Sequence, residues 1–279
     1  MKELNELLIE KFRNYLINEE KSRATVEKYM HDVSAFSLWL CKRTVDKSTV
    51  LEYKSYLMEN YKPASVNSVI SSLNSFFNYN EWYDCKVKSL KIQKKIFASK
   101  DKELTKAEYE RLLDAARAKN NERLYLLMQT ICSTGIRVSE LQFITVASIN
   151  AGVANINCKG KLRQVFLPKA LCKILIKYAR EQKITSGSVF VSRTGKPLDR
   201  SNIWNDMKKL CEYAGVSKDK VFPHNFRHLF ARTYYSIQKD IVRLADILGH
   251  SSINTTRIYT METGDVHRMQ MEKMGLLRE

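Results

Sequence analysis

The chain has 279 residues, 44% of them hydrophobic, and a formal net charge of +17. Its length is typical of two domains, and its hydrophobic fraction excludes a largely disordered chain. The excess positive charge favours an anionic partner, either nucleic acid or an anionic membrane surface.

Apolar residues recur at helical spacing through the first 80 residues of the chain. The pattern predicts four helices, over residues 3–18, 22–40, 47–60 and 63–77. Pro63 stands where the first turn of a helix tolerates proline. Since no strand pattern interrupts these helices, residues 1–85 are predicted to form a small helical bundle.

A lysine-rich segment follows the bundle. Residues 86–103 (KVKSLKIQKKIFASKDKE) are poorly periodic, which indicates a basic linker between domains. Thr105 and Glu108 then have the spacing of a capping box, which predicts the start of a helix. A second domain is therefore expected over residues 104–279.

The second domain combines helices with a few strands. Helical spacing covers residues 105–118, 121–133, 137–144, 168–183, 200–215, 224–237, 240–248, 252–260 and a tail from 263. Residues 153–157 and 163–167 alternate like strands around a Lys-Gly-Lys turn at 159–161, which predicts a β-hairpin. A short strand is expected at 188–192. The predicted fold class is mainly α with a small β-hairpin (α+β).

Several protein classes are disfavoured by missing patterns. No apolar run reaches the roughly 18 residues of a membrane-spanning helix, and MKELNELLIEKF lacks the pattern of a secretory signal. The six cysteines form no C-x-x-C pair, and no Walker A or G-x-G-x-x-G motif occurs. We therefore expect a cytoplasmic protein with reduced thiols and no nucleotide cofactor.

Three segments concentrate side chains that bind anions or transfer protons: STGIRVSEL at 133–141, PHNFRH at 223–228 and LGHSSINTTRIYT at 248–260. Taken singly, Arg137 could form a surface salt bridge and Tyr259 could pack in the core. His224 and His228, one helical turn apart, could ligate a metal, but no carboxylate lies between them as in H-E-x-x-H.

Together these side chains fit a site that acts on a phosphodiester. A guanidinium presents a rigid, permanently charged fork to two phosphate oxygens. Such groups stabilise charge on the non-bridging oxygens without a metal. A tyrosine hydroxyl can act as a covalent nucleophile on phosphorus.

These motifs resemble those of the tyrosine recombinase (phage integrase) family, most closely its compact Xer-type members. STGIRVSEL resembles the first arginine box, and HNFRH the H-x-x-R-H element. LGHSSINTTRIYT resembles the second histidine and nucleophile box, with Tyr259 nine positions after His250 as that box requires. Near the N-terminus, KSRATVEKYMHDVSAFSLWL resembles the helical core-binding domain, so the resemblance covers nearly the whole chain.

The resemblance implies how the phosphate is bound and attacked. Arg137 and Arg227 would hold the scissile phosphate, and His250 would donate a hydrogen bond to a non-bridging oxygen. Tyr259 would attack the phosphorus, leaving a 3′-phosphotyrosyl link and a free 5′-hydroxyl.

The same resemblance implies the supporting roles. His224 would assist proton removal from the tyrosine, which is protonated at neutral pH. Lys159 would protonate the leaving 5′-oxygen, and Glu140 would orient the arginine segment. The 5′-hydroxyl of a partner strand would then reverse the step, so neither a cofactor nor a metal is needed.

The hairpin departs from the family pattern. Members commonly read GKGNKER there, whereas residues 158–163 of this chain read CKGKLR, one residue shorter. Lys161 is therefore an alternative general acid to Lys159. His228 is expected to serve helix packing.

The family's partners and assembly are implied as well. The core-binding (SAM-like) domain, 1–85, and the catalytic domain would form a C-shaped clamp on duplex DNA. A homotetramer on two specific sites would recombine them through a Holliday junction, with a related recombinase or directionality factor as a further possible partner and no membrane partner. The tail, 263–279, carries the apolar residues Val266, Met269, Met271, Met274 and Leu276 without an obvious local core. In the family such a C-terminal helix is exchanged between protomers; the alternative is packing on its own protomer.

The implied function is site-specific DNA recombination, either integration or excision of a mobile element or resolution of dimers. The alternative is a type IB topoisomerase-like enzyme, which relaxes supercoils without joining partner strands. A requirement for two paired specific sites distinguishes the first function from the second.

Overall fold

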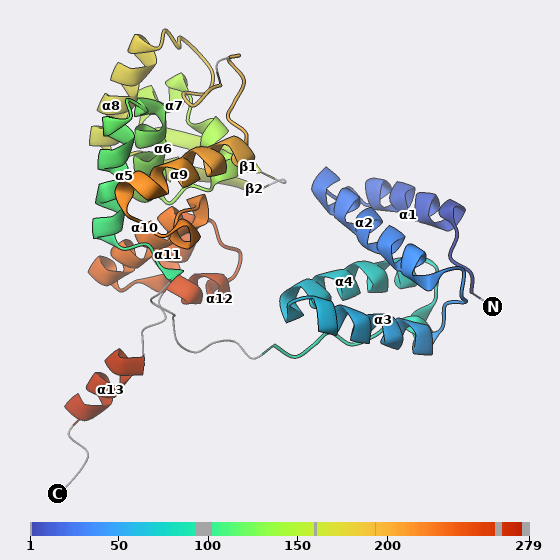
Figure 1. Cartoon of the computed structure of the whole chain (residues 1–279). Coiled ribbons are helices and arrows are strands. Elements are labelled where there is room, and N and C mark those ends of the chain that lie inside the picture. The colour runs from blue at the N-terminus through green and yellow to red at the C-terminus, as the bar shows by residue number, and fades with distance from the viewer. Residues whose placement is uncertain (1, 93–101, 159–160, 193, 260–263, 275–279) are drawn as a thin grey trace, which may run out of the picture. The chain divides into compact units, whose positions relative to one another are not determined.

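The computed structural model describes residues 2–92, 102–158, 161–192, 194–259 and 264–274. The chain divides into two compact units, 1–94 and 95–279 (Figure 1). Each unit has a hydrophobic core of its own. None of the helices in these ranges has the length and apolar character needed to cross a membrane. Part of the predicted linker, 93–101, lies outside the described residues.

The N-terminal unit contains the four predicted helices. They are α1 (Glu6–Asn18), α2 (Arg23–Leu40), α3 (Lys47–Asn60) and α4 (Pro63–Tyr79), followed by the 3-10 helix η1 (Tyr83–Cys85). Side chains cap the first three helices, and Pro63 occupies the first turn of α4 as expected. Phe12, Phe36 and Phe76 are fully buried at the centre of the bundle.

The second unit is helical around one hairpin. Its helices up to the hairpin are α5 (Lys106–Ala118), α6 (Glu122–Thr134), the 3-10 helix η3 (Val138–Phe143) and α7 (Val146–Ala151). Those after it are α8 (Lys169–Glu181), α9 (Arg200–Ala214), η4 (Lys218–Lys220), α10 (Pro223–Gln238), α11 (Ile241–Leu248), α12 (Ile253–Thr256), η5 (Arg257–Tyr259) and α13 (Gly264–Lys273). The capping box predicted at Thr105 and Glu108 is present at the start of α5.

The hairpin is formed by β1 (Val153–Cys158) and β2 (Lys161–Phe166), paired antiparallel from Val153–Phe166 to Cys158–Lys161 (Figure 1). Its turn, 159–160, falls outside the described residues. The predicted fold class, mainly α with a small β-hairpin, is confirmed.

The strand predicted at 188–192 is wrong. The segment forms only isolated bridges, Thr145 with Ser188 and Val191 with Pro197. Thr145 caps α7, so its chain turns into a helix after one bridge. Pro197 has no N–H to extend a ladder. Neither partner therefore offers a continuous strand.

Two predicted helices are shorter or tighter than expected. In the predicted helix 137–144, residues Val138–Phe143 form the 3-10 helix η3, with Glu140 N–H bonded to the carbonyl of Arg137. The predicted helix 252–260 divides into α12 and η5.

The helices after the hairpin bring distant motifs together. α10 packs against α6, and both α11 and η5 pack against α10. α6 ends at Gly135, which has a φ of +64°. A Cβ there would lie 2.5 Å from the ring of Phe230 on α10. The glycine therefore allows the end of α6 and α10 to approach closely.

Candidate active site

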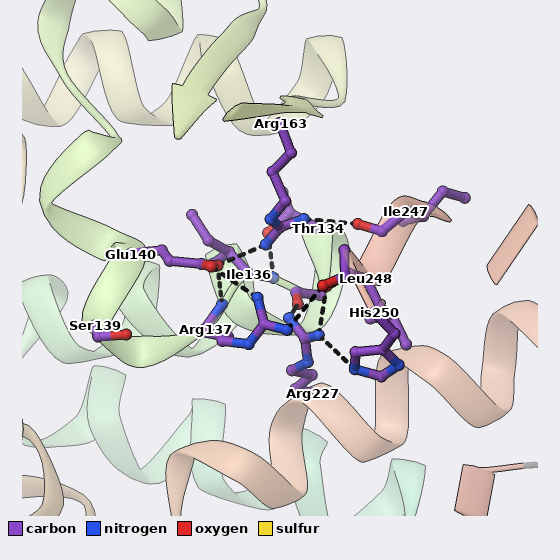
Figure 2. A network of polar contacts seen from close by, with 12 residues as sticks. Thr134, Ile136, Arg137, Ser139, Glu140, Arg163, Arg227, Ile247, Leu248 and His250 are labelled. Atoms are coloured by element: carbon purple, nitrogen blue, oxygen red, sulfur yellow. Dashed lines mark hydrogen bonds and ion pairs between the residues drawn. The ribbon is translucent and has the colours of Figure 1, made fainter. Parts of the chain in front are cut away.

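Five of the residues predicted to form the site converge from separate elements. Arg137 precedes η3, and Arg227 lies on α10. His250 follows Gly249, which ends α11, and Tyr259 ends η5. Glu140, in η3, joins the same polar network as Arg137, Arg227 and His250 (Figure 2).

Arg227 is a buried charge, with 2% of its surface exposed. Its guanidinium donates to the carbonyl of Gly135 at 2.5 Å and to that of Leu248 at 2.7 Å. Both carbonyls lie at helix C-termini, where the backbone carries partial negative charge. Burial and the charge of Arg137 lower the pKa of Arg227 to about 10, while a hydrogen bond with Tyr259 opposes the shift. Arg227 is therefore still cationic at pH 7.

The side chain of Arg137 is held by hydrogen bonds and is partly exposed to solvent. It donates to Glu140 Oε1 at 2.8 Å and to the carbonyl of Gly249 at 3.1 Å. Its side chain is 39% exposed, whereas that of Glu140 is 3% exposed. Arg137 thus presents a fixed charge to the surface beside the buried Arg227 (Figure 2).

Glu140 is a buried carboxylate shared by two arginines. It accepts from the backbone N–H of Arg137 at 2.9 Å and from Arg163 on β2 at 2.5 Å. Burial alone would raise the pKa of Glu140, but these hydrogen bonds and the charge of Arg163 lower it. Glu140 is therefore ionised at neutral pH.

His250 is held at both ring nitrogens. Nε2 lies 3.0 Å from Arg227, and Nδ1 lies 2.8 Å from the hydroxyl of Thr256, which is fully buried. Burial and the neighbouring arginines lower the pKa of His250 to about 4, so the ring is neutral at pH 7. Since a guanidinium only donates, Nε2 accepts from Arg227, and Nδ1–H donates to Thr256.

Tyr259 lies among three histidines and is 5% exposed. Its ring centroid is 4.5 Å from that of His228, 5.8 Å from His250 and 6.5 Å from His224. Burial lowers the pKa of His224 and lowers that of His228 to about 4, with help from the charge of Arg227. Neutral imidazoles therefore surround the tyrosine. His228, expected to serve helix packing, contacts it more closely than His224 does.

Two predicted site residues are not placed. Lys159 lies outside the described residues, and Lys161 is known here only as the first residue of β2. Within the described ranges, no three His, Cys, Asp or Glu side chains are grouped to hold a metal ion.

Two residues of the network were missed by the sequence analysis. Arg163 follows the hairpin turn, and its partner Ile247 is remote in the sequence. Thr256 lies within the nucleophile box, and its contact with His250 depends on the fold. An arginine in a predicted strand gives no signal of an internal ion pair.

The chain matches known families over both units. Residues 102–264 match the phage integrase family, and residues 9–83 match the phage integrase N-terminal SAM-like domain. The chain is 31% identical over 288 residues to tyrosine recombinase XerA of Thermococcus kodakarensis, covering 100% of this chain and 99% of the relative. It is 28% identical over 256 residues to tyrosine recombinase XerD of Vibrio cholerae, covering 85% of each chain.

Solved structures of the same fold are also similar. A lambda integrase (75–356) dimer bound to a COC′ core site has a TM-score of 0.75 at 18% identity, covering 94% of this chain and 96% of that one. XerH site-specific recombinase bound to its difH substrate has a TM-score of 0.71 at 21% identity, covering 99% of this chain and 85% of that one. The resemblance drawn from the sequence motifs is confirmed, and this chain belongs to the phage integrase family, the tyrosine recombinases.

Proposed function

We propose that the protein is a site-specific DNA recombinase that cuts and rejoins duplex DNA through a 3′-phosphotyrosyl intermediate and a Holliday junction. The observation that carries the proposal is the position of Tyr259, buried beside the cationic Arg227 and three neutral histidines. A nucleophile, an anion-binding group and proton acceptors thus meet at one place.

The scissile phosphate binds between the two arginines of the first and second boxes. Arg137 and Arg227 are both fixed by carbonyl oxygens, and Glu140 holds Arg137 as well. Groups held in place before the reaction need little reorganisation as charge develops on phosphate oxygens. His250 joins them once Nε2 carries the proton and donates to a non-bridging oxygen.

The histidines handle the proton of Tyr259. His224 is the base in our assignment, and His228 supports it by contacting both rings. The charge of Arg227 is one of the effects that now lower the pKa of these histidines. A bound phosphodiester anion offsets that charge, so the histidines become stronger bases when DNA is present.

The hairpin supplies the acid that completes cleavage. The Tyr259 oxygen forms a bond to phosphorus, the bond to the 5′-oxygen breaks, and that oxygen takes a proton from a lysine ammonium. We assign this role to Lys159, with Lys161 as the alternative. Attack by a 5′-hydroxyl of a partner strand reverses the step without a cofactor.

For the assembly, we propose a homotetramer on two specific DNA sites, acting in the cytoplasm. Residues 1–85 bind DNA, 86–103 link the domains, and 104–279 cut it, so that the chain clamps the duplex. A lambda integrase tetramer bound to a Holliday junction is among the proteins of this fold. A related recombinase or a directionality factor can complete the assembly.

The tail supports exchange between protomers. α13 exposes Met269 and Met271, and Met274 follows its last residue; 52%, 69% and 62% of their surfaces are accessible. Apolar side chains exposed along one short helix favour docking on another surface. We propose that this surface belongs to a neighbouring protomer of the tetramer.

The test starts from DNA recovered with a Tyr259→Phe variant, which binds its site without cutting it. A nicked duplex carrying that site lets the cleaved end diffuse away, so the covalent complex accumulates. The wild-type protein is expected to form a protein–DNA adduct, and the Tyr259→Phe variant none. An adduct formed equally by Tyr259→Phe contradicts the assignment, and relaxation of a plasmid with one site supports a topoisomerase instead.

A further inference from the structure

Arg163 on β2 forms a buried bridge to two other segments. Its side chain is 14% exposed. One guanidinium nitrogen donates to Glu140 at 2.5 Å, and another donates to the carbonyl of Ile247, near the end of α11, at 2.7 Å (Figure 2). The third nitrogen, Nε, is buried and has no hydrogen-bond partner among the described residues. The guanidinium thus ties β2 to η3 and to α11 at once.

Gly249, which follows α11, packs directly on this arginine. A Cβ at Gly249 would lie 2.5 Å from Cδ of Arg163 and 2.9 Å from Nε. The backbone immediately before His250 therefore rests on the side chain from β2. His250 in turn lies 3.0 Å from the guanidinium of Arg227. The contacts of Arg163 thus extend to the backbone that carries one of the phosphate-binding side chains.

The contacts of Arg163 and Arg137 close a ring. Glu140 accepts from Arg137 through Oε1 and from Arg163 through Oε2, and Figure 2 shows the carboxylate between the two guanidinium groups. Arg137 also donates to the carbonyl of Gly249, two residues after Ile247. Three segments, η3, β2 and the end of α11, are thereby fixed to one another.

The charges of the ring favour a role in phosphate binding. Glu140 is the one carboxylate bound by both guanidinium groups, so the three side chains together keep one positive charge. Without Arg163, the carboxylate would be held by Arg137 alone, through its guanidinium and its backbone N–H. Glu140 would then neutralise the arginine that has to attract the phosphate.

From these contacts we infer that Arg163 is a positioning residue for the scissile phosphate. It holds the carboxylate of Glu140 and balances its charge, so that Arg137 stays in place and keeps a positive charge for the phosphate. It also supports the backbone that leads to His250. The inference rests on the proposed function, and it gives Arg163 a role that acts through Arg137 and His250.

Stability alone explains the arrangement less well. A buried ion pair is weak evidence for stability, because desolvation offsets much of its attraction, and an apolar residue of similar size often packs as well. Burial of Nε, which has no hydrogen-bond partner within the described ranges, adds to the cost. A side chain that served packing alone would not need these polar groups.

The test measures binding in the Tyr259→Phe background, on the recovered site described above. One duplex carries the natural scissile phosphate. The other carries a methylphosphonate there, in which a methyl group replaces one non-bridging oxygen and removes the negative charge. Since the two duplexes are otherwise identical, the ratio of their dissociation constants measures how strongly the site binds that one charge.

With Arg163 present, the phosphate duplex should bind about 10-fold or more tightly than the methylphosphonate duplex, because hydrogen bonds between charged groups are strong. Arg163→Met should lower this ratio about 5-fold, while the affinity for the methylphosphonate duplex stays within about 3-fold. Arg137→Met removes the guanidinium itself and should show the same pattern. Arg180→Met, at an exposed arginine of α8, is the matched control and should keep the full ratio.

An unchanged ratio in Arg163→Met would overturn the inference, even if both duplexes bound more weakly, since Arg163 would then support the unit as a whole. If Arg163→Met does not fold, Arg163→Gln decides in the same way, because glutamine keeps two N–H donors but not the charge. A ratio close to one with Arg163 present would contradict the phosphate site of the proposed function instead.

Discussion

Individual residues at the site are held mainly by backbone carbonyls, and this preserves their charge for a ligand. Arg227 donates to Gly135 and Leu248, and Arg137 donates to Gly249. A carboxylate in place of the two carbonyls that hold Arg227 would neutralise its guanidinium, as Glu140 partly does for Arg137. Carbonyl oxygens fix the side chain and leave the positive charge to attract a phosphate.

Thr256 holds the ring of His250 through a hydrogen bond to Nδ1. In the structure Nδ1–H of His250 donates to the Thr256 hydroxyl, whereas a phosphate would require the proton on Nε2. A hydroxyl can accept or donate, so it can satisfy the ring nitrogen in both states. A buried threonine at this point lets the histidine change tautomer when DNA binds.

Thr256→Val is therefore expected to slow cleavage by about 10-fold or more, since a buried ring nitrogen loses its partner. Thr256→Ser keeps the hydroxyl and should retain most of the rate. Single-turnover adduct formation measures both, and DNA affinity should be similar for the two variants. A valine variant as fast as the serine variant would contradict the role of the hydroxyl.

A second prediction at this scale concerns pH. The pKa of His228 is lowered from its ordinary value of 6.5 to about 4, so its contribution to stability is present above pH 6.5. This contribution to stability is lost as the pH falls through about 4, because the unfolded chain binds the proton at a higher pH than the folded chain does.

Hydrogen exchange of α10 amides in the full chain can follow this loss. The exchange rates are corrected for intrinsic exchange at each pH. Between pH 7 and 4, the free energy of unfolding should fall by about 2 kcal/mol more in wild type than in His228→Gln. This value is reduced for the partial exposure of the ring. Parallel losses in the two proteins would show that His228 does not cause the effect.

At the scale of elements, the site depends on helix ends that approach neighbouring segments closely. Gly135 and Gly249 both have positive φ, and both meet a side chain within 2.5 Å of where a Cβ would lie. Gly215, after α9, has a φ of +59° with open space around it. A side chain would strain the backbone at all three glycines, but it would clash with a neighbour only at Gly135 and Gly249. Comparing substitutions at these positions therefore distinguishes the two effects.

Gly135→Ala should therefore destabilise the second unit by about 1–3 kcal/mol more than Gly215→Ala does, since only the first overpacks the interior. Protection of α6 amides from hydrogen exchange measures the difference in the full chain. Equal protection in the two variants would mean that Phe230 moves aside without cost.

Local sequence determined several elements well, and others not at all. The capping box at Thr105, the proline at the start of α4 and the alternation of the hairpin are local patterns, and all three were predicted. The strand at 188–192 was not formed, because its partners lie in a helix cap and a proline turn. Alternation shows that a segment can pair, but not what it pairs with.

The site shows the same division. Arginines, histidines and tyrosine were recognisable from motifs with fixed spacing. The bridge from Arg163 to Ile247 joins residues 84 positions apart, and only packing brings them together. Likewise, the contact of His228 with Tyr259 depends on how η5 packs on α10.

For the whole molecule, the net charge of +17 and the few charges at the site have different roles. If the protein binds DNA as proposed, we expect most of its lysines and arginines to supply affinity for the DNA backbone that is independent of sequence. In the proposed mechanism the site arginines act on one phosphate. Arg137 is partly exposed and Arg227 is buried, so solvent ions screen them less than they screen surface charges.

Raising salt from 50 to 200 mM should weaken DNA binding by about 10³-fold or more. The cleavage rate of DNA already bound should change little over the same range. Binding isotherms and single-turnover rates at saturating protein measure the two quantities. A parallel fall in both would indicate that the site charges are screened like the rest.

The central claim is that Tyr259, among the 14 tyrosines of the chain, forms the covalent link to DNA. The most direct measurement is digestion of the trapped adduct with protease and nuclease, followed by mass spectrometry of the peptide that carries the nucleotide. The account predicts a nucleotide joined through its 3′-phosphate to Tyr259. A nucleotide attached to another residue, or linked through a 5′-phosphate, would contradict it.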